Sequence, residues 1–60
     1  MHTYRCYLLD AHCHSATVEV IECPGDGTAK LRACEILAAR PAYSRVEVRE
    51  RGRRVHFRMS

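Results

Sequence analysis

The sequence predicts an α+β domain in which one helix packs on one face of a four-stranded, mainly antiparallel sheet. Two pairs of segments alternate apolar and polar residues, and each pair is joined by a short stretch of turn-forming residues. A single Ala- and Leu-rich segment lies between the pairs. The element order is therefore β-β-α-β-β. A strand order of 2-1-3-4 is expected, because it keeps every neighbouring pair antiparallel.

The first hairpin is expected from residues 3–10 and 16–23, which read TYRCYLLD and ATVEVIEC. A strand points successive side chains to opposite faces, so apolar residues two apart share a face. The stretch AHCHS between the strands is expected to be the turn. The residues expected to face the helix are Tyr4, Cys6, Leu8, Val18 and Val20.

The helix is expected over residues 28–40, TAKLRACEILAAR, because good helix formers fill this segment. Pro24 and the glycines after it interrupt the strand pattern, and Asp26 is expected to accept hydrogen bonds from the first turn. Pro41 disfavours helical backbone at the preceding residue and ends the helix at Arg40. The apolar face of the helix is expected to comprise Ala29, Leu31, Ala33, Cys34, Ile36, Leu37 and Ala38.

The second hairpin is expected from residues 43–50 and 53–59, YSRVEVRE and RRVHFRM, with Gly52 supplying a positive φ in the turn. Strict alternation places four residues toward the helix: Val46, Val48, Val55 and Phe57. The other face of the sheet has no second layer and would carry Tyr7, Leu9 and Ile21 among charges. An exposed apolar patch of this kind suits a second copy of the chain, so a homodimer is expected.

Length and composition indicate one globular domain over residues 1–60. A 60-residue chain with 47% apolar and 28% charged residues falls in the ordinary globular range, near the lower size limit for independent folding. No apolar run approaches the roughly 20 residues that span a bilayer, and the first residues do not resemble an export signal. We therefore expect a cytoplasmic protein without a membrane partner. Its four cysteines are expected to be reduced and packed, with disulfides or a bound metal as alternatives.

The basic charge is concentrated near the end of the chain, where residues 45–60 hold six arginines against two glutamates. A basic hairpin can follow a phosphate backbone, so nucleic acid is a possible partner, although solvated edge strands also favour arginine. The candidate residues for binding nucleic acid or another partner are Arg45, Arg49, Arg51, Arg53, Arg54 and Arg58. Few aromatic residues are expected on the outer face to stack against bases.

The expected first turn contains His12, Cys13 and His14, a combination that metals bind, and Cys23 or Cys34 would complete the ligand set. Adjacent strand residues point in opposite directions, and the spacing matches no common zinc module, so a polar turn is the preferred interpretation and a metal site the alternative. The adjacent Cys13 and His14 make an awkward nucleophile and base. No enzymatic activity and no cofactor are expected.

The pattern resembles a group of short bacterial proteins of unknown function. In that group a Tyr-containing strand ends in an aspartate-led turn, Glu-Cys precedes an Ala/Leu-rich helix, and Val-Glu-Val precedes a Gly turn and Arg-Arg-Val. The matching residues are Tyr4, Leu9, Asp10, Glu22, Cys23, Asp26, Ala33, Leu37, Val46, Glu47, Val48, Gly52, Arg54 and Val55. The resemblance spans roughly residues 4–56 and contains no catalytic signature. Two departures are DAHCH in place of Asp-x-Asp-Gly-His, and Arg49 in place of a tryptophan.

Together these features predict a non-enzymatic accessory or interaction domain that self-associates. The first alternative is a nucleic-acid-binding protein that uses the basic second hairpin. The second alternative is a protein that binds a metal through histidine and cysteine.

Overall fold

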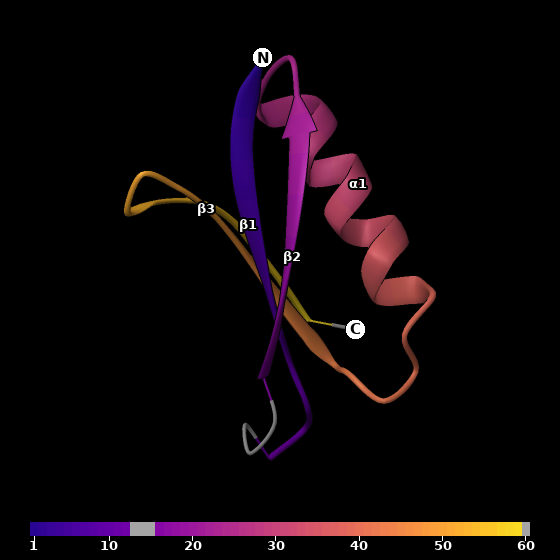
Figure 1. Cartoon of the computed structure of the whole chain (residues 1–60). Coiled ribbons are helices and arrows are strands. Elements are labelled where there is room, and N and C mark those ends of the chain that lie inside the picture. Colours follow the sequence, from indigo (N-terminus) through magenta and orange to yellow (C-terminus); the bar gives the residue numbers. More distant parts are fainter. Residues whose placement is uncertain (13–15, 60) are drawn as a thin grey trace.

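The computed structural model describes residues 1–12 and 16–59 and has the predicted order of elements (Figure 1). The elements are β1 (His2–Leu9), β2 (Ala16–Cys23), α1 (Asp26–Ala38), β3 (Arg45–Glu50) and β4 (Arg53–Met59). Neighbours in the sheet follow the order β2-β1-β3-β4, and every pair is antiparallel. The helix lies against one face and contacts all four strands. The predicted fold and strand order are therefore confirmed.

The helix begins two residues before the predicted start and ends two residues before the predicted end. Gly25 is the N-cap residue in extended backbone, and Asp26 makes no capping hydrogen bond, contrary to the prediction. Its carboxylate does lie in the first turn, where the helix dipole favours negative charge. At the other end the N–H of Ala39 donates to the carbonyl of Glu35 at 3.0 Å, and the chain leaves the helix before Pro41.

The core lies between α1 and the two central strands. Tyr4, Cys6 and Leu8 of β1 and two valines of β3 are fully buried, as predicted. From the helix, two of the three buried residues are alanines, whose small side chains allow close approach to the sheet. The buried helix residues are Ala29, Ala33 and Leu37. Leu31 was expected on this face but is 69% exposed, because it lies on the solvent side of the helix.

The facing of β2 is opposite to the prediction. Val18 is 48% exposed and Val20 is 60% exposed, whereas Cys23 is buried and Ile21 packs against the core. The β1–β2 register pairs Tyr4 with Ile21, and directly opposite residues share a face of the sheet. The alternation of residues in β2 was predicted correctly. The register of pairing with β1, which depends on the length of the β1–β2 connection, decides which of the two alternating sets faces the helix.

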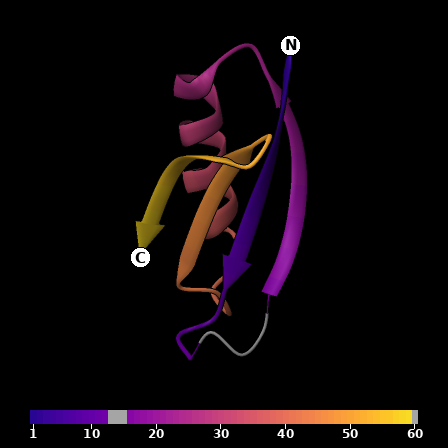
Figure 2. The same ribbon diagram turned by 90° about the vertical axis from the view of Figure 1, so that its left-hand side faces the viewer.

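The facing of β4 changes along the strand because of a β-bulge. Val48 pairs with His56, but the next residue, Arg49, pairs with Arg54, so Val55 is an extra residue without a partner in β3. Val55 packs against the core, as predicted, but Phe57 lies opposite Glu47 on the other face and is 42% exposed. A bulge bends the strand that contains it, and Figure 2 shows β4 (yellow) bending soon after the β3–β4 turn. The prediction that Phe57 faces the helix is therefore wrong.

A chain of polar contacts joins the start of α1 to three strands. The hydroxyl of Tyr4 donates to Oδ1 of Asp26 at 2.7 Å, and Arg53 of β4 reaches Oδ2 of Asp26 at 3.4 Å. Arg53 also donates to Glu50 at 2.9 Å, and Nδ1 of His2 lies 2.6 Å from the same carboxylate. We call these five residues the polar network. It ties the β3–β4 turn to the first turn of the helix.

Among the described residues, α1 is the only helix, and it is neither long nor apolar enough to cross a membrane.

Candidate functional site

The face of the sheet turned away from α1, which we call the open face, is seen in Figure 2 with the helix behind it. Strand pairing places three arginines side by side across three strands: Arg5 of β1 lies opposite Arg49 of β3, which lies opposite Arg54 of β4. We call these residues the arginine row. Val20 continues the row onto β2, opposite Arg5.

The next row across the open face is aromatic and apolar. Tyr7 of β1 lies opposite Val18 of β2 and Glu47 of β3, and Glu47 lies opposite Phe57 of β4. Tyr7 is half-buried and Phe57 is 42% exposed, so both rings present part of their surface to solvent. Two aromatic rings therefore lie in the row directly adjacent to three guanidinium groups.

The positive charge of the arginine row is only partly compensated. Nε of Arg49 lies 3.2 Å from Oε2 of Glu47, and a nitrogen of Arg54 lies 4.0 Å from the same oxygen. Arg5 has no hydrogen-bond or ion-pair partner within residues 1–12 and 16–59. Like charges directly opposite each other destabilise a sheet. Among the described residues, Arg49 and Arg54 share one carboxylate and Arg5 has none, so the arginine row carries an excess of positive charge.

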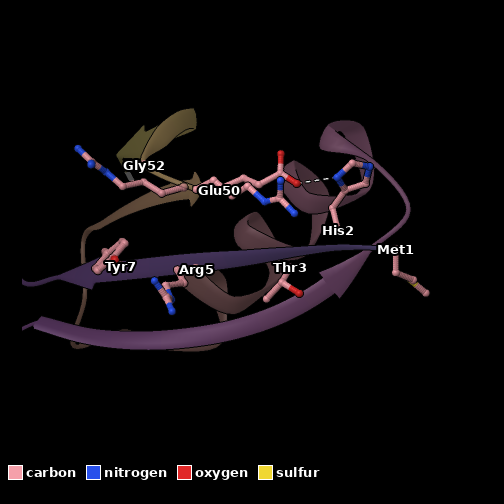
Figure 3. Close-up of a pocket in the computed structure, with 9 residues that line it drawn as sticks. Met1, His2, Thr3, Arg5, Tyr7, Glu50 and Gly52 are labelled. Atoms are coloured by element: carbon pink, nitrogen blue, oxygen red, sulfur yellow. Dashed lines mark hydrogen bonds and ion pairs between the residues drawn. The ribbon is translucent and has the colours of Figure 1, made fainter.

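A cavity of about 430 Å³ extends from the arginine row toward the β3–β4 turn (Figure 3). It opens where the β1–β3 ladder stops, because the last described pair is Arg5 with Arg49 while β1 continues back to His2. Arg5, Arg49 and Arg51 line it, and Tyr7 borders it on the side of the aromatic row. At the opposite end, Figure 3 shows the ion pair between His2 and Glu50.

The six arginines predicted as a binding set do not form one surface. Arg45, Arg49 and Arg54 lie in open-face positions, and Arg51 lies in the turn at the edge of the cavity. Arg53 points to the helix side, where Glu50 and then Asp26 hold its guanidinium and raise its pKa. Arg58 lies opposite the buried Val46, also on the helix side.

Three residues of the site were missing from the predicted set: Arg5, Tyr7 and Phe57. A signal for two of them was present, since Arg5 and Tyr7 are two residues apart in a strand and must share a face. The outward position of Phe57 could not be predicted in this way. Val55 and Phe57 are two residues apart, so alternation predicts the same face for both, and the bulge cannot be recognised from the pattern of apolar residues.

The polar network holds its carboxylates in the charged form. The hydrogen bond from Tyr4, with that from Arg53, lowers the pKa of Asp26 below its ordinary value. Arg53, helped by His2, lowers the pKa of Glu50. Burial and the bond to Asp26 raise the pKa of Tyr4 to about 12. These groups satisfy one another and serve as a structural tie rather than as part of the open face.

The alternative metal site receives little support from the residues that can be placed. Cys13 and His14 lie outside the described residues. His12 is exposed in the turn after β1, where its N–H donates to Oδ1 of Asp10 at 3.1 Å. Cys23 pairs with His2 at the far end of the hairpin, about seven residues or roughly 23 Å along the strand from that turn. Within the described part of the chain, no three His, Cys, Asp or Glu side chains gather as a metal site.

Two of the three described cysteines are packed in the core, as expected, and the third is half-buried. Cys6, Cys23 and Cys34 are free, and the first two are buried in the core. Burial, with a smaller effect of Cys23, raises the pKa of the Cys6 thiol, which opposes formation of the reactive thiolate.

Comparisons with models of protein families, with curated proteins and with solved structures gave no match for this chain. The assignment of function therefore depends on the chemistry of the open face.

Proposed function

We propose that this protein is a small non-enzymatic binding domain whose open face binds single-stranded nucleic acid. The observation that carries the proposal is the placement of the arginine row beside the rings of Tyr7 and Phe57. This proposal retains nucleic acid as the ligand but moves the interface from the second hairpin to the face of the sheet.

The two rows suit the two parts of a nucleotide. Guanidinium groups bind phosphates through paired N–H donors, and they do so without losing their charge. Exposed aromatic rings stack on unpaired bases, a contact worth about 1–3 kcal/mol per base. Tyr7 lies two residues from Arg5 and opposite Glu47. A nucleic-acid strand lying across the sheet therefore meets guanidinium groups for its phosphates in one row and aromatic rings for its bases in the next.

The cavity at the end of the arginine row supports the same ligand. Its volume of about 430 Å³ lies in the range of pockets that hold small molecules. Arg5, Arg49 and Arg51 supply three cationic groups to its wall, while Tyr7 supplies a ring. We infer that a phosphate group occupies this cavity when the adjacent base stacks on Tyr7.

Charge disfavours stacking two copies of the chain through their open faces. Four arginines occupy the open-face positions of β1, β3 and β4, against Glu47 and, at the end of β2, Glu22. Two identical faces with an excess of positive charge repel each other, since an isologous interface brings the same patch together. An anionic ligand gains from the same charge. The open face is therefore assigned to nucleic acid rather than to a second copy.

The test is a fluorescence anisotropy titration with labelled oligouridylate and oligothymidylate of about 12 nucleotides, a length that one small sheet can cover. Binding is expected, with log K falling against log salt with a slope of about −2, as three phosphate contacts on a single strand give. A duplex of the same length is expected to bind more weakly, because its bases are not free to stack. No binding at about 50 mM salt, where phosphate contacts are strongest, would refute the proposal.

Matched pairs of variants localise the interface. Phe57→Ala is expected to weaken binding about tenfold, whereas Leu31→Ala, which removes an exposed apolar side chain from α1, leaves it unchanged. Arg54→Gln is expected to lower affinity and reduce the salt slope by about 0.7, whereas Arg58→Gln removes the same charge from the helix side. Equal effects of Arg54→Gln and Arg58→Gln would show that only net charge matters, and the open face would lose its assignment.

A further inference from the structure

The sheet has two edge strands, β2 and β4, and β4 carries more of the features that oppose pairing with another strand. An edge strand offers every second N–H and C=O to any chain that can align with it. Proteins block such edges with bulges, bends, prolines and charged side chains. The two edges of this sheet differ sharply in these features.

The β4 edge is blocked in two ways. The bulge at Val55 interrupts its regular pairing pattern and bends the strand. Three of its seven residues are arginines: Arg53, Arg54 and Arg58. A second β4 strand would bring these charges together, so this edge is unsuited to self-pairing.

The β2 edge has no bulge and no proline, and its only charged side chains are two glutamates, Glu19 and Glu22. Ala16–Cys23 is an eight-residue strand without lysine, arginine, proline or glycine, and its ladder with β1 runs without a shift from Leu9–Ala16 to His2–Cys23. Val18 and Val20 lie on its open-face side and are about half exposed. No described strand pairs with its outer edge. Figure 2 shows β2 at one margin of the sheet, with the other strands on one side of it.

We propose that β2 pairs antiparallel with β2 of a second copy, giving a twofold-symmetric homodimer with one continuous eight-stranded sheet. The proposal does not depend on the binding of nucleic acid. The twofold axis is perpendicular to the sheet, so both helices lie on one side and both open faces on the other. The expected homodimer thus forms through a strand edge rather than through the apolar face.

The sequence of β2 selects one register for this pairing. Directly opposite residues must share a face, which leaves two symmetric registers that overlap nearly the whole strand. One centres on Glu19 and sets two carboxylates opposite each other, which destabilises a sheet. The other centres on Val20, which then contacts its counterpart, while Val18 lies opposite Glu22 of the second copy. The register centred on Val20 is the one we assign.

The remaining charges are compatible with this register. Glu19 faces the helix side and forms an ion pair with Arg40 of its own chain. In the dimer Glu19 lies opposite Ile21 of the second copy, so the two Glu19 side chains are diagonal neighbours across the junction. The Arg40 side chain of each copy compensates the charge of its own Glu19. On the open-face side the junction buries the exposed surface of Val20 in each copy.

The experiment is sedimentation velocity and equilibrium on the full chain over a concentration series up to about 1 mM, where even a weak dimer is populated. A monomer–dimer equilibrium is expected. Val20→Lys, which sets two ammonium groups opposite each other, is expected to raise the dimer Kd at least about tenfold. Val18→Lys is the matched control: it adds the same charge on the same face two residues away but places it opposite Glu22, so the Kd is expected to stay the same or fall.

Each result decides the proposal. A wild-type chain that stays monomeric at the highest concentration overturns it, as does a dimer that Val20→Lys leaves intact. Val18→Lys and Val20→Lys acting equally would exclude the assigned register. Thermal unfolding of both variants by circular dichroism checks that each chain is folded. The oligonucleotide titration reports separately on Phe57 and Arg54, so loss of the dimer and loss of nucleic-acid binding can be told apart.

Discussion

The hydroxyl of Tyr4 donates a 2.7 Å hydrogen bond to the carboxylate of Asp26 and so joins the buried middle of the sheet to the first turn of the helix. Tyr4 is fully buried, and Asp26 is also bound by Arg53 from the second hairpin. A single buried hydroxyl thus fixes where the helix starts relative to the sheet.

Tyr4→Phe is expected to lower the Tm by a few degrees while the fold is retained, because the ring still fills the core but Asp26 loses its shortest hydrogen bond. The pKa of Asp26 is expected to rise toward its ordinary value of 3.8, which carboxyl NMR titration measures. Tyr7→Phe is the control, since the Tyr7 hydroxyl has no partner among the described residues and its removal should leave the Tm unchanged. Equal stability of the two variants would contradict the role given to the Tyr4 hydroxyl.

Stability is expected to fall in acid as the polar network is protonated. The folded state lowers the pKa of Asp26 below 3.8 and that of Glu50 below 4.5. A carboxyl group whose pKa is lower in the folded state contributes stability above its unfolded pKa, and this contribution disappears as the pH falls through the folded pKa. The Tm should therefore hold down to about pH 5 and decline below it. In Asp26→Asn the Tm should decline less below about pH 5 than in the wild type. The same dependence of Tm on pH in both proteins would contradict the stabilising role of the polar network.

The β3–β4 turn is expected to become more stable when Arg51 is replaced by asparagine. Arg51 has a φ of 51° and Gly52 a φ of 81°, and asparagine tolerates the left-handed region better than arginine. Arg51→Asn should stabilise the domain by about 0.5 kcal/mol in urea unfolding. Gly52→Ala should destabilise it by about 1 kcal/mol through backbone strain alone, because an added Cβ meets no atom within 4 Å.

The same Arg51→Asn variant separates stability from binding. Arg51 lines the cavity at the end of the arginine row. Its removal is expected to weaken oligonucleotide binding even as the fold becomes more stable. Unchanged affinity in the more stable variant would remove Arg51 from the proposed interface.

The contact between helix and sheet is expected to tolerate little added volume. Ala33 is fully buried against the strands, so Ala33→Leu should cost about 1–3 kcal/mol by overpacking. That is a large fraction of the stability expected for 60 residues. Ala38→Leu makes the same change on an exposed position of the same helix and should stay within about 0.5 kcal/mol of the wild type. Urea unfolding of the two variants compares them directly, and equal stabilities would contradict the assigned packing.

Much of the architecture is predictable because it rests on local chemistry. Alternation in two pairs of segments, the alanine-rich stretch between them and the turn at Gly52 lead to β-β-α-β-β and to the correct strand order. The facing of β1 and β3 also follows, because Arg5 alternates with Tyr4 in β1 and charged residues alternate with Val46 and Val48 in β3. The start of the helix was harder to predict from the sequence, because the Asp26 side chain binds Tyr4 and Arg53, which are distant in the sequence, and not the backbone of the first helical turn.

The sequence by itself determined the elements, their order and the concentration of arginine near the end of the chain. Only the tertiary structure decided which residues share a surface. The register of the first hairpin turned Val18 and Val20 outward, and one extra residue at Val55 placed Phe57 on the same face as Tyr7 and the arginine row. The physical reason is that strand alternation has two equivalent phases. Pairing between strands chooses the phase, and a single bulge reverses it partway along a strand.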